Sequence, residues 1–238
     1  MNNLIVAVIN LDKDKVRMER SERQLDDLKL PFLRVQAIEG KALNSESCLV
    51  SNANVAACWL SHVKCYETLL SSKFERMLIL EDDFVIKHKK SFLLKLKAAS
   101  ISEHNLVQLG FLSFGVVPKF EQLLLLLNKM FLTLTYAIPV NSIDVTLFKK
   151  IRNRRERFYS AGKGFIPSDF LAGAHGYVVD RKAAELLRVV NNPVFLPTDG
   201  LLQSVSRSGT LSAKRSIQSY ITQAPGISSI ESRFMKRR

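Results

Sequence analysis

The chain contains little cysteine: its 238 residues include three, Cys48, Cys58 and Cys65. The number is odd and no Cys-x-x-Cys pair occurs, which argues against a disulfide framework and suits a reducing compartment. Cys58 and Cys65 lie seven residues apart in a stretch that we predict to be helical. We therefore expect them to share one face of that helix, as small core residues rather than as a bridge.

The sequence also lacks a long uninterrupted apolar run. Residues 4–11 are too short for the core of a secretory signal and follow no positive leader, so we predict a strand there. The most apolar later stretch, residues 123–140, is interrupted by Asn128 and Lys129 and falls short of a membrane span. These features predict a cytoplasmic protein, with peripheral contact to the cytoplasmic face of the inner membrane left open.

Acidic residues are scarce beside basic ones, with 22 Asp and Glu against 35 Lys and Arg and a net charge of +13. This excess predicts an anionic partner: nucleic acid, an anionic membrane leaflet or a phosphorylated substrate. The basic clusters in residues 149–163 and 214–238 are explained equally well as a solvated loop and a solvated tail. A basic nucleic-acid-binding protein without catalytic activity is therefore the main alternative to an enzyme, although the RNA-binding signatures of aromatic and basic residues are missing.

Apolar runs alternate with amphipathic segments through the first half. We predict strands over residues 4–9, 32–37, 77–80 and 106–109, and helices over residues 13–30 and 54–70. In the second half we favour a helix over 111–140, exposed loop or short helices over 141–167, a strand over 173–179, and helices over 181–190 and from 197. This order predicts one α/β domain over residues 1–238, with a mostly parallel central sheet and helices on both faces.

Three consecutive acids, Glu81, Asp82 and Asp83, end the strand predicted over residues 77–80. In an extended chain Glu81 and Asp83 point to one face and Asp82 to the other. Two carboxylates on one face can hold a hard divalent cation such as Mg²⁺ or Mn²⁺, which commonly carries phosphate oxygens. The alternative is a polar strand end that merely meets water.

A second polar group, Asn10-Leu11-Asp12, ends the strand predicted over residues 4–9. Ligands of parallel sheets bind outside the carboxyl ends of the strands, so we expect this group and the acids to meet at one edge. An Asx turn would explain Asn10 and Asp12 equally well.

Several motifs, in this order along the chain, resemble those of glycosyltransferase family 25, the bacterial lipooligosaccharide galactosyltransferases and their collagen-modifying relatives. They are Ile9-Asn10-Leu11-Asp12 with Arg17 behind it, Cys58-Trp59-Leu60-Ser61-His62, Leu78-Ile79-Leu80-Glu81-Asp82-Asp83, and Pro197-x-Asp199. The chain departs from the family at Ala57, where Gly is usual, and residues 111–167 hold no motif that can be aligned.

The resemblance implies the nucleotide-sugar transferase fold called GT-A, a UDP-sugar donor, usually UDP-galactose or UDP-glucose, and inversion at the anomeric carbon. The acceptor would be lipooligosaccharide or another glycan, and no nucleic-acid partner is expected. We expect a nucleotide-sugar-binding half over residues 1–110 and an acceptor-binding half over residues 111–238.

Sugar transfer from a nucleoside diphosphate requires neutralisation of the leaving group and removal of a proton from the acceptor hydroxyl. We expect Glu81 and Asp83 to anchor the Mn²⁺ or Mg²⁺, and Asp199, with Asp169 as second candidate, to act as the base. Candidate donor contacts are Asn10, Leu11, Asp12, Arg17, Ser61, His62 and Asp82. The competing explanations are a surface position for Arg17, a structural role for His62 and a helix N-cap for Asp199.

Overall fold

The computed structural model describes residues 3–43, 52–112, 165–167 and 170–224. These residues belong to one compact unit that combines residues 1–112 with residues 165–238. Nearly all of the helix predicted over 111–140, most of the loop predicted over 141–167, Cys48, Asp169 and the basic C-terminal end lie outside the described residues.

The described strands form one mixed sheet in the order β2-β1-β3-β7-β5-β8-β6, and β9 pairs with both β4 and β5. The strands of the first half are β1 (Leu4–Asn10), β2 (Phe32–Gln36), β3 (Arg76–Glu81), β4 (Phe84–Ile86) and β5 (Leu106–Gly110). Those of the second half are β6 (Phe165–Pro167), β7 (Gly176–Asp180), β8 (Ala213–Ser216) and β9 (Ile221–Gln223).

Parallel pairing joins β2, β1 and β3, as the alternation of strands and helices predicts. However, β7 lies between β3 and β5 and runs antiparallel to both. The chain thus returns from its second half to the middle of the sheet. Periodicity identifies the type of an element but not its position or direction in the sheet, so the mixed character could not be foreseen.

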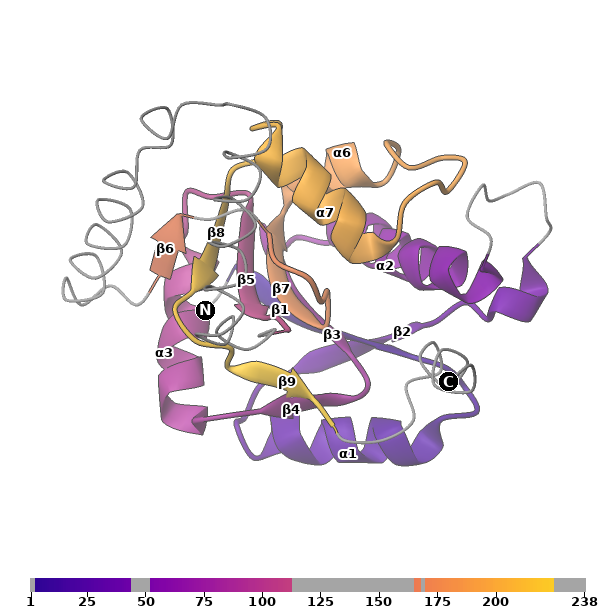
Figure 1. The fold of residues 1–238 in the computed structure, drawn as a ribbon. Coiled ribbons are helices and arrows are strands. Elements are labelled where there is room, and N and C mark those ends of the chain that lie inside the picture. Colours follow the sequence, from indigo (N-terminus) through magenta and orange to yellow (C-terminus); the bar gives the residue numbers. More distant parts are fainter. Residues whose placement is uncertain (1–2, 44–51, 113–164, 168–169, 225–238) are drawn as a thin grey trace, which may run out of the picture. The chain divides into compact units, whose positions relative to one another are not determined.

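Helices cover both faces of the sheet, which confirms the predicted layering (Figure 1). One buried cluster joins the sheet to α1 (Lys15–Asp26) and α3 (Lys89–Ser100). The other joins it to α2 (Ala53–Ser71), α6 (Arg181–Leu187) and α7 (Thr198–Arg207).

Local signals set the ends of these helices. Lys29 adopts a left-handed conformation, and the Leu30 amide donates to the Leu25 carbonyl, which closes the turn after α1. Asn52 caps α2 by accepting a hydrogen bond from the Asn54 amide. The prediction of the α1 and α2 segments is confirmed to within a few residues at each end.

The sequence analysis missed the 12-residue helix α3 and several short elements, which are β4, β8, β9 and the 3-10 turn η1 (Gly40–Ala42). The prediction of loop or helix was wrong for β6, which pairs with β8. A three-residue strand has little pattern of its own and depends on its partner for stability. Within the described ranges, no helix is both long and apolar enough to cross a membrane.

Candidate functional site

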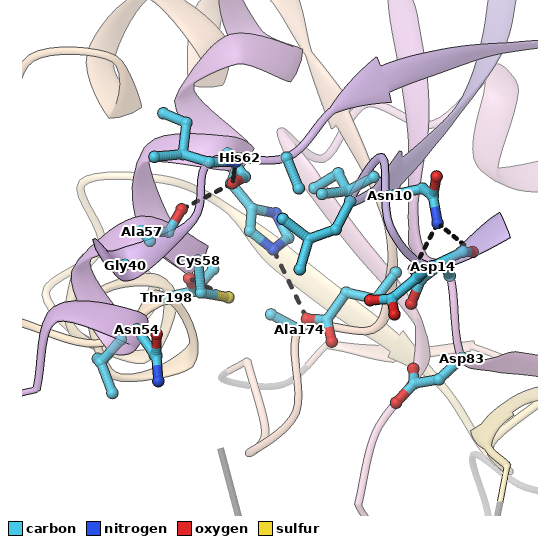
Figure 2. A pocket seen from close by; sticks show the side chains of 18 of the residues that line it. Asn10, Asp14, Gly40, Asn54, Ala57, Cys58, His62, Asp83, Ala174 and Thr198 are labelled. Carbon is cyan, nitrogen blue, oxygen red and sulfur yellow. Dashed lines mark hydrogen bonds and ion pairs between the residues drawn. The ribbon is translucent and has the colours of Figure 1, made fainter. Parts of the chain in front are cut away.

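A cavity of about 570 Å³ opens at the carboxyl ends of β1 and β3 (Figure 2). Its walls come from the β1–α1 loop, η1, the N-terminal half of α2, the β3–β4 turn and the start of α7. This is the sheet edge at which the two polar groups were predicted to meet. The volume lies within the range of about 300–1,000 Å³ that is usual for small-molecule sites.

Asp82 joins the two polar groups. Its Oδ2 atom accepts a hydrogen bond from Asn10 Nδ2 at 2.7 Å, and its Oδ1 atom accepts one from Arg17 Nη1 at 3.1 Å. Asn10 Nδ2 also donates to the Asp14 carbonyl at 3.0 Å. Burial raises the pKa of Asp82, although Asn10 and Arg17 oppose that effect. The carboxylate of Asp82 therefore ties the turn after β3 to β1 and α1.

Asp83 lies in the turn after β3 and lines the cavity (Figure 2). Its Oδ1 atom is buried and has no hydrogen-bond partner among the described residues. Burial, followed by the negative charges of Glu81 and Asp82, raises the pKa of Asp83 to about 7, while Arg17 opposes the change. A carboxylate so placed would be stabilised by a cation.

Glu81 faces α2, where it meets two side chains that lie one turn apart on that helix. Its Oε1 atom lies 3.6 Å from Nε2 of His62. One ligand atom each from Cys58, His62 and Glu81 lies within 4.8 Å of the other two. Figure 2 shows Cys58 and His62 extending from α2 on one side of the cavity, with Asp83 on the other.

The surroundings shift the pKa values of Glu81 and Cys58 in opposite directions. Burial alone would raise the pKa of Glu81, but His62, His175 and Arg17 hold it below its ordinary value. Burial, with a contribution from the charge of Glu81, raises the pKa of the Cys58 thiol to about 12. Without a cation, Cys58 is therefore a neutral thiol and Glu81 a carboxylate.

The ring of His62 is fully buried, and a hydrogen bond at its Nδ1 atom holds it in place. Nδ1 lies 2.9 Å from the hydroxyl of Tyr177, which in turn lies 2.6 Å from the hydroxyl of Tyr66. The rings of His62 and Tyr177 also stack, with centroids 5.7 Å apart. His62 is thus held in one orientation, with Nε2 directed toward Glu81.

Asp199 lies in the first turn of α7 and also lines the cavity. Its Oδ2 atom accepts from the Gly173 amide at 3.2 Å, and its Oδ1 atom accepts from the Gly200 amide at 2.9 Å. Pro197 occupies the N-cap position of α7, so Asp199 is not the cap. Asp169, the second candidate base, lies outside the described residues.

The remaining predicted contacts separate into two groups. Leu11 and Ser61 line the cavity, and the Ser61 hydroxyl accepts from the Ile38 amide at 2.9 Å, which holds the segment before η1 against α2. Asp12 is exposed, hydrogen-bonds to Arg34 and Gln36, and does not line the cavity. An Asp12 role in direct contact with a ligand is therefore not supported by this geometry.

Sequence reasoning missed some residues of the site. Cys58 is predicted above to be a small core residue, but it is only partly buried and lines the cavity. Its i, i+4 spacing to His62, which is that of two ligands on one helix face, was the available signal. Lys13 and Lys41 border the cavity and form ion pairs with Glu39 at 3.3 and 2.7 Å. Their contribution depends on the path of the β2–η1 segment, which has no strong sequence signal.

The comparisons with known proteins agree with this picture. A family model described as glycosyltransferase family 25 (LPS biosynthesis protein) matches residues 3–202. Procollagen galactosyltransferase 2 from Homo sapiens is 28% identical over 109 residues, covering 38% of this chain, and its Mus musculus counterpart matches to the same extent. The match spans about 17% of the length of these curated relatives.

Proposed function

The chain belongs to glycosyltransferase family 25, and from that premise we propose that it is a glycosyltransferase that moves a hexose, galactose first among the candidates, from a UDP-sugar. The proposed acceptor is lipooligosaccharide or another glycan, and the proposed stereochemical outcome is inversion. The observation that carries the proposal is the cavity at the ends of β1 and β3, where Asn10, Asp82 and Asp83 converge within the part of the chain that the family model covers.

The rim of this cavity is suited to a nucleoside diphosphate. Lys13, Arg17 and Lys41 lie along the β1–α1 and β2–η1 sides, where Lys13 and Lys41 pair with Glu39 and Arg17 pairs with Asp82. Charged donors of this kind form strong hydrogen bonds to phosphate oxygens. In the proposed complex, Asn10, Leu11 and the rim would hold the nucleotide and would place the anomeric carbon near Asp199.

The family also suggests a divalent metal, and the residues of the cavity fit one. Asp83 Oδ1 is a buried acceptor for which no donor is found among the described side chains, and Glu81 brings a second carboxylate to the same strand end. We assign the direct ligand role to Asp83, with Glu81 as second anchor. When bound, Mn²⁺ or Mg²⁺ would neutralise the charge that develops on the leaving diphosphate.

The remaining requirement is a base for the acceptor hydroxyl, and we assign it to Asp199. Hydrogen bonds from Gly173 and Gly200 hold its carboxylate in place at the cavity wall. In an inverting displacement, the acceptor oxygen bonds to the anomeric carbon as the bond to UDP breaks, and Asp199 takes the proton. Asp169 remains the second candidate.

We further propose that the protein contacts an anionic membrane at its cytoplasmic face, and that α3 takes part. This helix carries four lysines and no acidic residue. Lys90, Leu94, Lys97 and Ile101 fall on one helix face, with Leu94 69% exposed and Ile101 80% exposed. Basic and apolar residues on one exposed face are typical of helices that lie on anionic membranes.

The function is tested by measuring thermal stability with UDP-, GDP- and CMP-sugars, each with and without Mn²⁺, followed by transfer assays with the sugar that stabilises most. We expect stabilisation by a UDP-sugar that depends on the metal, and transfer to a glycan acceptor. Stabilisation by RNA alone would contradict the proposal and would favour a nucleic-acid-binding protein.

A further inference from the structure

We propose that Cys58, His62 and Glu81 form a site for a borderline-soft divalent cation, with Zn²⁺ as the fitting ion. Ligand atoms of these three side chains already lie within 4.8 Å of one another. Within the part of the chain that the structure describes, this is the one such group of three. The inference concerns a cation distinct from the diphosphate metal, and it does not depend on sugar transfer.

The strongest argument is the state of the His62 ring. Its Nε2 atom is buried, and it has no hydrogen-bond partner in the described ranges. The 3.6 Å separation from Glu81 Oε1 is too long for a hydrogen bond. Leaving a buried polar atom unpaired destabilises the folded protein, so its retention here requires a reason. A cation between Nε2 and the carboxylate would provide one.

The donor set argues for the type of ion. A thiolate and an imidazole nitrogen favour Zn²⁺ over Mg²⁺ or Ca²⁺, which prefer oxygen ligands. Cys58 and His62 stand at i and i+4 on α2, and Glu81 comes from the end of β3. On binding, the Cys58 thiol would lose its proton to solvent and the thiolate would become a ligand.

The surroundings of the ring are those of a metal ligand. Zinc-bound histidines usually engage their second nitrogen in a hydrogen bond that fixes the tautomer and the ring orientation. Here Tyr177 performs this role at Nδ1, and Tyr66 supports it. The chain of two buried tyrosines leaves Nε2 as the nitrogen that is directed at the site.

The site is also open. Cys58, His62 and Glu81 all line the cavity, so a fourth coordination position would face it. Three protein ligands with an open fourth position are typical of zinc sites that bind a water molecule or a ligand, and not of closed structural sites. Glu81 belongs to both proposed cation sites, and Oε1 is the oxygen nearest to His62.

The test uses Co²⁺ as a spectroscopic probe for zinc on the whole chain. We expect one thiolate-bound Co²⁺ per chain, a thiolate-to-cobalt band in the near ultraviolet, and loss of the spectrum when Zn²⁺ is added. Cys58→Ala should remove the band. Cys65→Ala is the matched control, because Cys65 lies on the same helix but is buried in the core, and this variant should keep the band.

Two further variants separate this inference from the transferase proposal. Asp83→Asn should keep the cobalt band even where transfer is lost. Tyr177→Phe should keep the band but weaken metal affinity by about 10–100-fold, as expected when the partner of a metal-bound histidine is removed. A wild-type chain without the band, or a band that survives Cys58→Ala, would overturn the inference whether or not the protein transfers sugar.

Discussion

At Asp83, burial and two neighbouring carboxylates act on one side chain in the same direction. Asp83→Asn keeps the shape of this side chain and removes its charge. We expect transfer to fall by about 100-fold or more, because a bound metal supplies several kcal/mol of transition-state stabilisation. Transfer rates with saturating donor and Mn²⁺ measure the effect, and a rate within a few-fold of wild type would remove Asp83 from the metal site.

The same substitution has a second expected result that concerns stability. The pKa of Asp83 is raised from 3.8 to about 7, so the folded protein binds this proton more tightly than the unfolded chain does. Stability therefore falls as pH rises through this window, and the full loss is present above about pH 7. Each tenfold change in an ionisation constant corresponds to about 1.4 kcal/mol. The shift from 3.8 to about 7 therefore lowers the free energy of unfolding by a few kcal/mol at most.

Without added metal, Asp83→Asn should thus raise the melting temperature at about pH 8 and should raise it less at about pH 5. Thermal unfolding at both values, with wild type alongside, provides the measurement. An equal change in melting temperature at the two pH values would mean that the ionisation of Asp83 does not contribute to the pH dependence of stability.

Asp199 requires a different test, because its carboxylate has a structural contact as well as a proposed chemical role. In Asp199→Asn, the amide oxygen can still accept from Gly173 while the contact with the Gly200 amide is lost, so we expect the fold to be kept with a small loss of stability. We expect turnover with saturating acceptor to fall by about 10²–10⁴-fold, the usual result of losing a general base. UDP affinity and melting temperature should change little.

Asp180→Asn is the control for this substitution. Asp180 caps α6 by accepting from the Ala183 amide, and its Oδ2 atom also accepts from Asn105 and lies 3.7 Å from Nη2 of the buried Arg76. Asp180→Asn keeps the cap but removes the charge that faces Arg76, so the control variant should lose stability while it retains turnover. If Asp199→Asn also retains turnover, its carboxylate serves only to hold the loop at Gly173, and Asp169 becomes the next residue to test.

At the scale of elements, α3 offers a test of the membrane proposal. Lys90→Glu combined with Lys97→Glu reverses the charge of the exposed face while leaving the buried Phe92 and Leu96 in place. Each basic group near an anionic leaflet is worth about 1 kcal/mol, so binding to phosphatidylserine vesicles should weaken by at least about tenfold. Co-sedimentation with such vesicles at low salt measures this.

A matched control is available on the opposite face of the sheet, where Lys182 and Arg188 are exposed at α6. Reversing both of those charges changes the net charge of the protein equally. If it weakens vesicle binding as much as the α3 variant does, then overall charge, and not the α3 face, attracts the protein to the membrane.

Elements also show how far the sequence could predict the structure. Buried β-branched runs and amphipathic spacing were enough for β1, β2, β3, α1 and α2, and strand-end polarity located the cavity. The antiparallel insertion of β7 and the short strands β4, β6, β8 and β9 depend on pairing between distant segments. The contact of Cys58 and His62 with Glu81 likewise arises when α2 packs on β3, so it could not be derived from the acidic motif alone.

At the scale of the whole molecule, the described cavity lies within a single unit. Its described lining comes from residues before 113 and after 164, and so do both described core clusters. Residues 113–164 form the second unit. The unit that holds the proposed donor cavity thus has a hydrophobic core of its own, which is the usual requirement for independent folding.

We therefore expect donor binding and acceptor choice to separate along the chain. Replacing residues 113–164 with a flexible Gly/Ser linker should leave a folded protein that UDP with Mn²⁺ still stabilises against heat. Transfer to the glycan acceptor should be lost, while slow hydrolysis of the UDP-sugar should remain, because the donor site and Asp199 are retained. Melting curves, UDP affinity and product analysis of the two reactions measure these three effects.

If the linker variant still transfers sugar to the acceptor at a normal rate, acceptor recognition lies in the unit that holds the cavity. If it folds but no longer binds UDP, residues 113–164 contribute to the donor site, and donor binding and acceptor choice do not separate between the two units.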